Sequence, residues 1–376
     1  MSLYKCIDCE KDFSHKSKYT QHQKRKTPCR KSIDVDVDIL QKEVEEKLQE
    51  LKITENKICE PELSFSLGEK EYTEEIFQKP FLKWVGGKTQ IIHHIIRKFP
   101  SVMENYYEPF LGGGSVLFAL LTLHKHKQIT IKHKIYAFDI NPSLIYTYNH
   151  IKFNKDELYE YIKQYTVEYN SIIENEENMI NRKSKTIEEA KQSKENYYYW
   201  LRNKFNMMDV ECIEHSALFI FLNKTCFRGV YREGPNGYNV PYGHYKQLKE
   251  IISKTELDII SALIQKVEFK CCDFTECLKE LKKDDFVYLD PPYLPENKTS
   301  FVKYVVNGFD MKSHQRLFAD IKKINTLGGK FLMSNSNMKM IKEEFKDFSM
   351  DEIAARRAIH SKKPETMTTE ILIYNY

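Results

Sequence analysis

One stretch of sequence decides the fold of most of this chain: Phe286-Val287-Tyr288-Leu289-Asp290-Pro291-Pro292-Tyr293. Its first four residues are apolar or aromatic, which is typical of a buried strand in a parallel sheet. The prolines end the strand because proline has no N–H to donate, and each proline holds the residue before it extended. We therefore expect Asp290 at the carboxyl end of a central strand, where open α/β sheets bind their ligands.

The turn after this strand combines a carboxylate, a main-chain carbonyl and an aromatic ring. Two hydrogen-bond acceptors and one stacking face suit a flat heterocycle that carries an amino group. Asp and Pro are also common in ordinary turns, so a turn without a ligand is the alternative. The rest of the chain decides between the two.

The composition is that of a globular protein without a membrane span. The 376 residues are 41% hydrophobic and 30% charged, which suits one large domain with appendages or two domains. No apolar run approaches the roughly 18 residues that a span needs, and the N-terminus has no signal-peptide pattern. Nine cysteines, several of them in apolar contexts, suggest reduced thiols and an intracellular location.

Charge is unevenly distributed along the N-terminal part of the chain. Residues 1–31 hold nine Lys/Arg and three Asp/Glu, whereas residues 32–76 hold five and fourteen. We interpret residues 32–76 as an acidic connector, with a helix over residues 39–53 and a linker without periodicity after it. The formal net charge of the whole chain is only +4, which does not by itself indicate nucleic-acid binding.

Residues 1–31 have the ligand spacing of a small zinc module. Cys6 and Cys9 form a CxxC pair, and His22 and Cys29 follow. The spacing resembles that of a ββα zinc finger, except that Cys29 takes the place of the last histidine. Zinc would fold so short a segment, and the alternative is a disordered basic tail. The basic helix of such a module would contact DNA phosphates or a groove, which suggests a targeting role.

Two glycine-rich segments precede the central strand. Residues 80–88 (PFLKWVGGK) place a glycine pair beside Lys88. Residues 106–115 (YYEPFLGGGS) predict a strand and a glycine loop that leads into an apolar helix, and the next strand ends at Asp139. An acid at the end of the strand after a glycine loop binds ribose hydroxyls. This pattern alone would also fit a nicotinamide enzyme, but we find no hydride-acceptor site.

Four motifs in this order resemble those of DNA adenine-N6 methyltransferases of the D12 class, the group related to the GATC-modifying enzymes. They are residues 81–88, residues 108–115, Asp139-Ile140-Asn141 and residues 290–293, and the resemblance covers about residues 78–376. It implies an α/β fold, a Rossmann-like class I methyltransferase sheet with a mainly helical target-recognition domain inserted in it. The expected segments are cofactor-binding (77–153), target-recognition (154–250) and catalytic (251–376).

The resemblance also implies the residues of a cofactor site for S-adenosylmethionine. They are Trp84, Lys88, Pro109, Phe110, Gly112, Gly114, Asp139, Asp273 and Asp290. Asp139 would hold the ribose hydroxyls, and Asp273 would lie near the cofactor adenine. For Trp84, packing in the core is the alternative.

The catalytic turn would act on an adenine flipped out of the duplex. Asp290 and the carbonyl of Pro291 would accept hydrogen bonds from the two N–H groups of N6, which frees the nitrogen lone pair. Pro292 belongs to the same turn, and Tyr293 would stack on the base. We expect no catalytic metal.

Residues 223–243 resemble the target-recognition hairpin of the family. The predicted contacts with double-stranded DNA come from Lys83, Arg228, Arg232 and Asn239. Either arginine could read guanine with two hydrogen bonds or bind only phosphate. GATC readers usually carry asparagine where this chain has Arg228, so the recognition sequence stays open. Residues 155–200 show no motif, and we expect a solvated helical face there.

Alternatives of two kinds stay open at the level of sequence. The methyl acceptor could be N4 of cytosine, or adenine in RNA. The fold could also be an inactive DNA-binding module that is targeted by its finger. The intact turn at residues 290–293, Lys88 and the glycine loop favour an enzyme. We expect no membrane partner, and a monomer is compatible with the sequence.

Overall fold

The computed structural model describes residues 4–6, 12–13, 15–23, 77–173, 180–293, 309–356 and 367–376. The chain forms two compact units, Met1–Glu69 and Lys70–Tyr376, and each is described by itself. The predicted connector at residues 32–76 lies outside the described residues, as do Cys9 and Cys29. Within the described ranges, every helix is too short or too polar to span a lipid bilayer.

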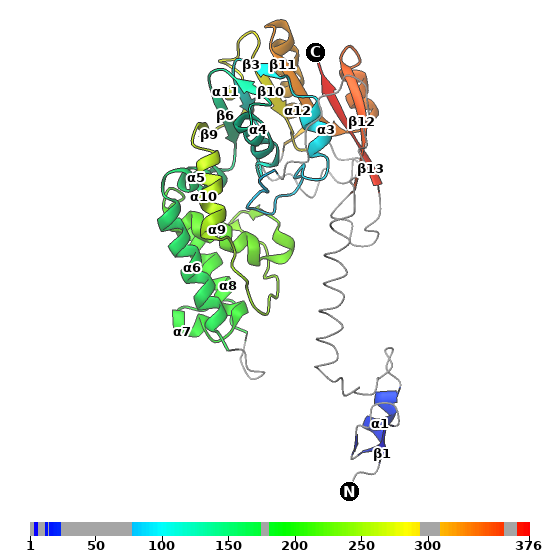
Figure 1. The fold of residues 1–376 in the computed structure, drawn as a ribbon. Coiled ribbons are helices and arrows are strands. Elements are labelled where there is room, and N and C mark those ends of the chain that lie inside the picture. The colour runs from blue at the N-terminus through cyan, green and yellow to red at the C-terminus, as the bar shows by residue number, and fades with distance from the viewer. Residues whose placement is uncertain are drawn as a thin grey trace, which may run out of the picture. The chain divides into compact units, whose positions relative to one another are not determined.

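The N-terminal unit contains a short hairpin followed by a helix. Strands β1 (Tyr4–Lys5) and β2 (Asp12–Phe13) pair antiparallel, and helix α1 (Lys16–Gln23) follows them (Figure 1). The ring of Phe13 lies 5.9 Å from that of Tyr19 and 4.9 Å from that of His22. Cys6 and His22 are buried. The order of elements is that of the predicted ββα module, while two of its four predicted ligands lie outside the described residues.

A seven-stranded sheet forms the centre of the larger unit. Its strand order is β12-β13-β11-β10-β4-β6-β9. The bounds are β4 (Tyr106–Glu108), β6 (Ile135–Asp139), β9 (Val267–Cys271), β10 (Phe286–Leu289), β11 (Lys330–Ser336), β12 (Ser349–Arg356) and β13 (Met367–Tyr374). Strands β11, β10, β4, β6 and β9 run parallel. Strand β13 pairs antiparallel with β11, and β12 pairs antiparallel with β13 at the edge of the sheet. The prediction of a mainly parallel sheet in an α/β fold is confirmed.

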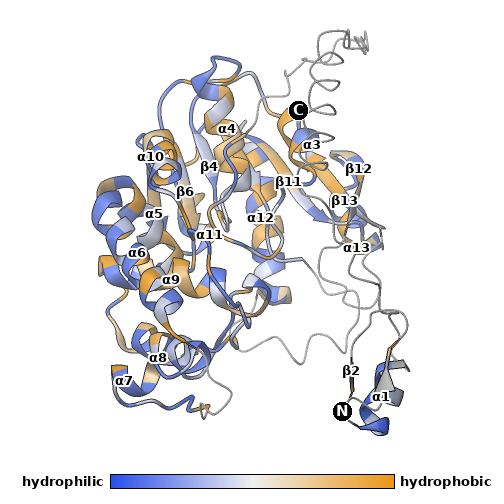
Figure 2. Ribbon diagram, turned by 60° about the horizontal axis from the view of Figure 1, so that its bottom comes forward, coloured by the Kyte–Doolittle hydropathy of each residue, from blue (hydrophilic) through white to orange (hydrophobic). Residues whose placement is uncertain are grey.

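Different helices cover the two faces of the sheet. Successive strand residues point to opposite faces, so in β10 Phe286 and Tyr288 belong to one core, and Val287 and Leu289 to the other. The first core includes α3 (Ile92–Arg97), α4 (Ser115–Lys125), α5 (Pro142–Phe153) and α10 (Lys254–Leu263), and the second α11 (Phe274–Cys277), α12 (Met311–Thr326) and α13 (Lys339–Glu344). Figure 2 shows hydrophobic colour along β11 and β13. Burying each large apolar side chain contributes about 1.5–3 kcal/mol.

The strand order reverses direction between β4 and β10. From β4 the chain moves outward to β6 and β9, and then returns to β10 on the other side of β4. In open α/β sheets, the crevice at the carboxyl ends of the strands beside such a reversal binds ligands. Asp290 follows β10 directly, as predicted, and the glycine loop follows β4. The two predicted site segments therefore lie together at this reversal.

A group of helices extends the fold beyond the sheet (Figure 1). It consists of α6 (Lys155–Ser171), α7 (Ile187–Ala190), α8 (Lys194–Met207) and α9 (Ile213–Thr225), with a hairpin of β7 (Glu233–Gly234) and β8 (Gly237–Tyr238). The expectation of a solvated face over residues 155–200 is wrong for the start of α8, where residues 193–199 are all buried. Its tyrosines keep their hydroxyls satisfied: Tyr197 donates to Glu168 at 2.8 Å, and Tyr198 to the carbonyl of Val240 at 2.9 Å.

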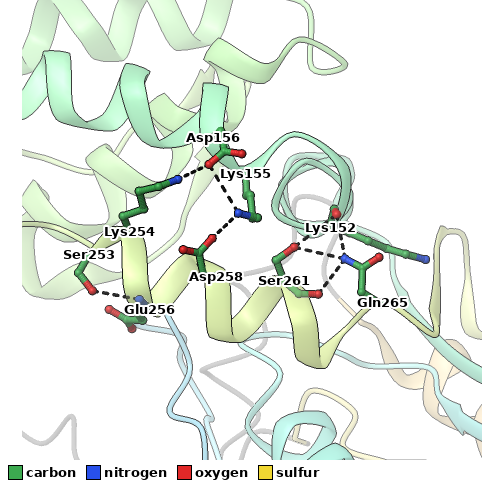
Figure 3. Close-up of polar contacts among 9 residues, drawn as sticks. All are labelled: Lys152, Lys155, Asp156, Ser253, Lys254, Glu256, Asp258, Ser261 and Gln265. Carbon is green, nitrogen blue, oxygen red and sulfur yellow. Dashed lines mark hydrogen bonds and ion pairs between the residues drawn. The ribbon is translucent and has the colours of Figure 1, made fainter.

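Helix α10 is tied to the corner between α5 and α6 (Figure 3). Lys254 pairs with Asp156 and Lys155 pairs with Asp258. Near the other end of α10, Ser261 donates to the carbonyl of Lys152 at 3.4 Å. Because partly exposed ion pairs contribute only about 0–1 kcal/mol each, these contacts mainly fix how the helical group meets the sheet.

Candidate active site

The glycine loop after β4 leaves room for close approach of the main chain. Gly112 and Gly114 have positive φ angles of 51° and 73°. A Cβ atom on Gly112 would meet Cδ1 of Trp84 at 2.9 Å, and one on Gly114 would meet the hydroxyl of Tyr148 at 2.4 Å. Glycine is therefore required at both positions by backbone conformation and by packing. Trp84 is half-buried and packs on this loop. This position is compatible both with contact to a cofactor and with packing in the core.

Asp139, at the end of β6, is fixed beside the glycine loop. Its two carboxylate oxygens accept hydrogen bonds from the N–H groups of Gly112 and Asn141, each at 3.0 Å. Burial raises the pKa of Asp139, although the main-chain N–H groups oppose this. The structure thus brings the predicted ribose acid against the predicted loop, with Pro109 buried at the end of β4.

Asp290 forms a buried ion pair with Lys88. The ammonium of Lys88 lies 2.8 Å from Oδ1 of Asp290 and also donates to the carbonyl of Gly86 at 2.8 Å. Its side chain is 4% exposed and that of Asp290 18%. Burial raises the pKa of Asp290 to about 6, while the positive charge of Lys88 opposes the rise. Lys88 therefore helps to keep this carboxylate ionised near neutral pH.

Tyr293 is held by a residue that the sequence did not point to. Its hydroxyl donates to Oε2 of Glu370 at 2.7 Å, and the ammonium of Lys88 lies 4.8 Å from its ring centroid. Glu370, on β13, is also 3.9 Å from that ammonium. Pro291 is buried and Pro292 is exposed. An acid within a terminal strand carries no motif, and only the pairing of β13 with β11 brings it to this turn.

Glu108 is a second acid that sequence reasoning missed. It ends β4 and is buried, and Tyr106 donates to its Oε2 at 2.7 Å. Burial raises the pKa of Glu108 to about 8, and the charge of Asp290 adds to the rise, against the hydrogen bond from Tyr106. The pair Glu108-Pro109 repeats the strand-end pattern of Asp290-Pro291, which is the signal that could have revealed it. At neutral pH Glu108 is thus mostly protonated, whereas Asp290 is mostly ionised.

Replacing Glu108 with glutamine should flatten the pH dependence of stability. The folded chain keeps its proton up to about pH 8, whereas the unfolded chain releases it near 4.5. The wild-type free energy of unfolding should therefore fall by about 1.4 kcal/mol per pH unit between pH 5 and 8, relative to the variant. Urea unfolding of both proteins across this range measures the difference. A constant difference would contradict a protonated Glu108.

Asp273 and Phe110 lie near each other, through Phe274. Asp273 caps α11 by accepting from the N–H of Thr275 at 3.0 Å, and Arg316 approaches its other oxygen at 3.6 Å. The ring of Phe110 lies 5.6 Å from that of Phe274, the residue after Asp273. The predicted role of Asp273, near the adenine of the cofactor, is compatible with its observed role as the N-cap of α11.

The predicted DNA-contacting residues Lys83 and Arg228 lie next to each other. The amide side chain of Asn223 holds the main chain of Lys83 with hydrogen bonds of 2.9 and 2.8 Å. A Cβ atom on Gly229 would meet Cδ of Lys83 at 2.4 Å, so the lysine side chain packs directly against the main chain of Gly229. Arg228 is exposed, has a φ of 60°, and places its guanidinium 5.2 Å from the ring centroid of Phe227. Asn223 had no predicted role.

Arg232 and Asn239 form a second exposed pair. Nε of Arg232 donates to Oδ1 of Asn239 at 2.6 Å, and the guanidinium also donates to its main-chain carbonyl at 3.2 Å. The β7–β8 hairpin between them fixes this geometry. The four predicted DNA contacts are therefore all exposed and come from neighbouring elements.

Among the described residues there is no cluster of three or more His, Cys, Asp or Glu that could hold a metal. The predicted zinc ligands Cys6 and His22 are described and buried, whereas Cys9 and Cys29 are not described. The zinc prediction is therefore neither confirmed nor contradicted.

Comparison with known proteins assigns the chain to a family. The family model of the D12 class N6 adenine-specific DNA methyltransferases matches residues 84–359. A type II methyltransferase, M.MjaIII of Methanocaldococcus jannaschii, is 36% identical over 79% of this chain and 99% of its own length. The type II methyltransferase M1.LlaDCHI of Lactococcus lactis subsp. cremoris is 31% identical over 79% of this chain and 95% of its own. A DNA adenine methylase of Haemophilus influenzae is 31% identical, over 76% and 89%. The buried acid at the end of β10, the glycine loop beside it and these matches lead to one conclusion: the chain belongs to the D12 class of N6 adenine-specific DNA methyltransferases.

Proposed function

We propose that this adenine-specific DNA methyltransferase transfers a methyl group from S-adenosylmethionine to N6 of an adenine flipped out of duplex DNA. The observation that carries the proposal is the placement of Asp290 and the Pro291 carbonyl at the strand reversal, where the glycine loop follows the neighbouring strand β4 and is bound to Asp139. DNA as the substrate also favours an intracellular site of action.

The residues around the glycine loop fit a nucleoside-containing cofactor. Gly112 and Gly114 leave main-chain surface that a Cβ would cover, and each Asp139 oxygen keeps a lone pair beyond its hydrogen bond to an N–H. We assign the ribose to Asp139, the adenine side to Asp273 and Phe110, and the methionine side to Pro109 and the loop. S-Adenosylmethionine supplies a methyl group on a sulfonium sulfur, which is ready for attack by a nitrogen lone pair.

The catalytic turn makes the adenine nitrogen nucleophilic. The N6 lone pair is delocalised into the ring, and acceptors for both N–H protons favour a pyramidal nitrogen with its lone pair free. Lys88 binds Oδ1 of Asp290, so Oδ2 and the carbonyl of Pro291 would receive the amine. The negative carboxylate also stabilises the positive charge that develops on nitrogen. Tyr293, held by Glu370, would stack on the base.

The rate of methyl transfer should fall as Asp290 becomes protonated. With a pKa of about 6, the carboxylate is mostly ionised at pH 7.5 and mostly protonated at pH 5. A protonated acid no longer offers its charge, so the single-turnover rate should drop about tenfold per pH unit below pH 6. Measurement at saturating DNA and cofactor between pH 5 and 8 checks this. A flat profile over that range would contradict the assignment of Asp290 as the acceptor.

We propose that Lys83, Arg228, Arg232 and Asn239 contact the DNA. Their exposure beside the hairpin, and the hydrogen bonds that hold Lys83 and Arg232 in place, support this. Arg232 donates to Asn239 through Nε and Nη2, so its Nη1 would make the contact with a base edge or a phosphate.

Replacing Arg228 with asparagine should change the sequence that is modified. Asparagine tolerates a φ of 60°, so the variant should fold. Loss of a contact that reads guanine with two hydrogen bonds relaxes discrimination by about 1–3 kcal/mol, or roughly 5- to 150-fold. Sequencing of DNA modified by each protein measures the preference at every position. The control Arg228→Lys keeps a positive charge but loses the two parallel N–H donors of the guanidinium. If Arg228 contacts only phosphate, the sequence preference should stay unchanged in both variants.

The enzymatic proposal is tested with the purified chain, labelled S-adenosylmethionine and unmethylated duplex DNA. Mass spectrometry of the digested product should show N6-methyladenine. N4-methylcytosine, or modification of RNA alone, would replace the proposed acceptor, and no transfer on any DNA of random sequence would refute the enzyme.

We further infer that residues 1–31 form a zinc module. The hairpin and helix order, and the burial of Cys6 and His22 beside Phe13, support this. Elemental analysis should give one zinc per chain, lowered in the Cys6→Ser variant, while an unchanged content would refute it.

A further inference from the structure

Tyr231 lies between the predicted cofactor loops and the predicted DNA-reading residues. Its ring stacks on Trp84 with a centroid distance of 5.6 Å and an interplanar angle of 22°. The ring of Phe219 meets it at 61°, with centroids 5.4 Å apart. The indole of Trp84 in turn packs on the glycine loop, where a Cβ on Gly112 would lie 2.9–3.0 Å from its atoms. A continuous packed layer thus runs from the glycine loop to Tyr231.

The hydroxyl of Tyr231 reaches the turn that follows β6. Burial raises the pKa of Tyr231, and the nearby side chains of Asn141 and Ser143 oppose this rise, so the hydroxyl lies close to this turn. The N–H of Asn141 donates to Oδ1 of Asp139 at 3.0 Å, and Oδ1 of Asn141 caps α5 by accepting from the N–H of Leu144. A shift of this turn when a ribose binds to Asp139 would therefore displace the neighbours of the Tyr231 hydroxyl.

Tyr231 also contacts the DNA-reading hairpin. Its hydroxyl donates to Glu233, the first residue of β7. Arg232, which directly follows Tyr231 in the chain, donates from Nε to Oδ1 of Asn239 across the hairpin at 2.6 Å. The ring of Tyr238, on β8, lies 5.5 Å from that of Tyr231. Movement of Tyr231 therefore has to be transmitted to the hairpin that carries Arg232.

We propose that Tyr231 is a positioning residue that couples binding of S-adenosylmethionine to recognition of DNA. The inference rests on the proposed function of the two sites. Cofactor bound at Asp139 and the glycine loop stabilises one arrangement of Trp84, the Asn141 turn and Tyr231, and that arrangement holds Arg232 for its base or phosphate. Linkage requires the reverse as well: DNA must tighten cofactor binding by the same factor. The layer supplies contiguous packing and hydrogen bonds that such coupling needs.

The coupling is measured with S-adenosylhomocysteine, which has no methyl group to transfer. The dissociation constant of an unmethylated duplex is determined by fluorescence anisotropy with and without saturating S-adenosylhomocysteine. The wild-type ratio of the two constants should be about tenfold, within the roughly 5- to 150-fold range of allosteric coupling. Calorimetry with and without DNA should give the same factor for S-adenosylhomocysteine. The ratio is the informative quantity provided that each variant is folded without ligand, which circular dichroism checks, because bound ligand would otherwise also shift the folding equilibrium.

Two substitutions separate the ring from the hydroxyl. Tyr231→Leu removes the stack on Trp84 and should bring the coupling ratio close to one. Tyr231→Phe keeps the stack but removes the hydroxyl, with its hydrogen bond to Glu233 and its position beside Asn141 and Ser143. The ratio should then fall about threefold, which corresponds to the energy of roughly one hydrogen bond. Tyr159→Phe is the matched control, since it removes a tyrosine–glutamate hydrogen bond of 3.0 Å to Glu250 on the helical group and should keep the wild-type ratio.

The outcomes distinguish this inference from the function on which it rests. Failure of the wild-type chain to bind S-adenosylhomocysteine or DNA would overturn the proposed function. Binding of both with a ratio of one, or a wild-type ratio in both Tyr231 variants, would overturn the coupling role and leave the function intact. If Tyr231→Leu does not fold, the comparison of Tyr231→Phe with Tyr159→Phe decides alone.

Discussion

The Asp290→Asn variant should lose methyl transfer by about a thousandfold while it still binds S-adenosylmethionine. The asparagine amide has the same shape but lacks the negative charge that stabilises the positive charge developing on N6 of adenine. Removal of one such preorganised group lowers the rate by about 100- to 1,000-fold. Asp290 belongs to the predicted cofactor set, but most of that site, at the glycine loop and Asp139, is built from other elements, so the affinity should change little. Single-turnover transfer and calorimetric binding of the cofactor measure the two quantities separately.

The same substitution leaves a buried cation without its partner, and the experiment has to separate that effect. The ammonium of Lys88 lies 2.8 Å from Asp290, and an unpaired buried charge destabilises by about 3–5 kcal/mol. The double variant Asp290→Asn/Lys88→Met removes this penalty and should recover stability without recovering the rate. Recovery of the rate in the double variant would show that the chemistry does not depend on Asp290. Asp310→Asn, at the cap of α12, is the control for an Asp-to-Asn change, since asparagine caps equally well.

The Gly114→Ala variant should lose about 2–5 kcal/mol of the free energy of unfolding. The residue has a φ of 73°, where an L side chain costs about 1–2 kcal/mol, and its Cβ would lie 2.4 Å from the hydroxyl of the fully buried Tyr148. Overpacking at such a site costs a further 1–3 kcal/mol or so. Because Tyr148 also donates to the carbonyl of Gly112 at 3.3 Å, displacement of its ring should disturb the loop and weaken cofactor binding. Urea unfolding gives the stability.

Gly86→Ala is the matched control for the backbone term. Its φ is 82°, and a Cβ there would meet nothing within 4 Å, so it should lose only about 1–2 kcal/mol. A second control, Gly114→Ala combined with Tyr148→Phe, removes the hydroxyl that the new methyl group meets and should recover part of the loss. Equal losses in the two single variants would mean that the loop relaxes around Tyr148.

Sequence reasoning succeeded where a property is local. The apolar run Phe286–Leu289 and the prolines after it fix a buried strand and its end. Gly112 and Gly114, in the loop after Glu108, have positive φ angles. Both features depend on neighbours in the chain, so the strand, the loop and Asp290 at the edge were predictable. The order of the strands is not a local property, and only the structure gives it.

Residues that act through tertiary contacts were not predictable in this way. Glu370 reaches Tyr293 only because β13 pairs with β11, and Tyr231 meets Trp84 only because the hairpin folds back on the glycine loop. Residues 193–199 were expected to face solvent because tyrosine, asparagine and lysine are polar, yet α8 buries them by pairing their polar ends with Glu168 and with main-chain carbonyls. Polarity in a sequence does not show whether a hydrogen-bond partner will be present.

The neighbouring positions of β4 and β10 have a consequence for how the protein reaches its native state. The side chain of Asp285 binds the main chain of Asn105 across 180 residues of sequence, and the chain between them contains the whole helical group. Closing so long a loop costs entropy before any pairing is gained, so we expect assembly of the cleft to be slow and late. Nascent chains that end before residue 286 would contain the glycine loop but neither β10 nor Asp290. Such chains could not methylate DNA.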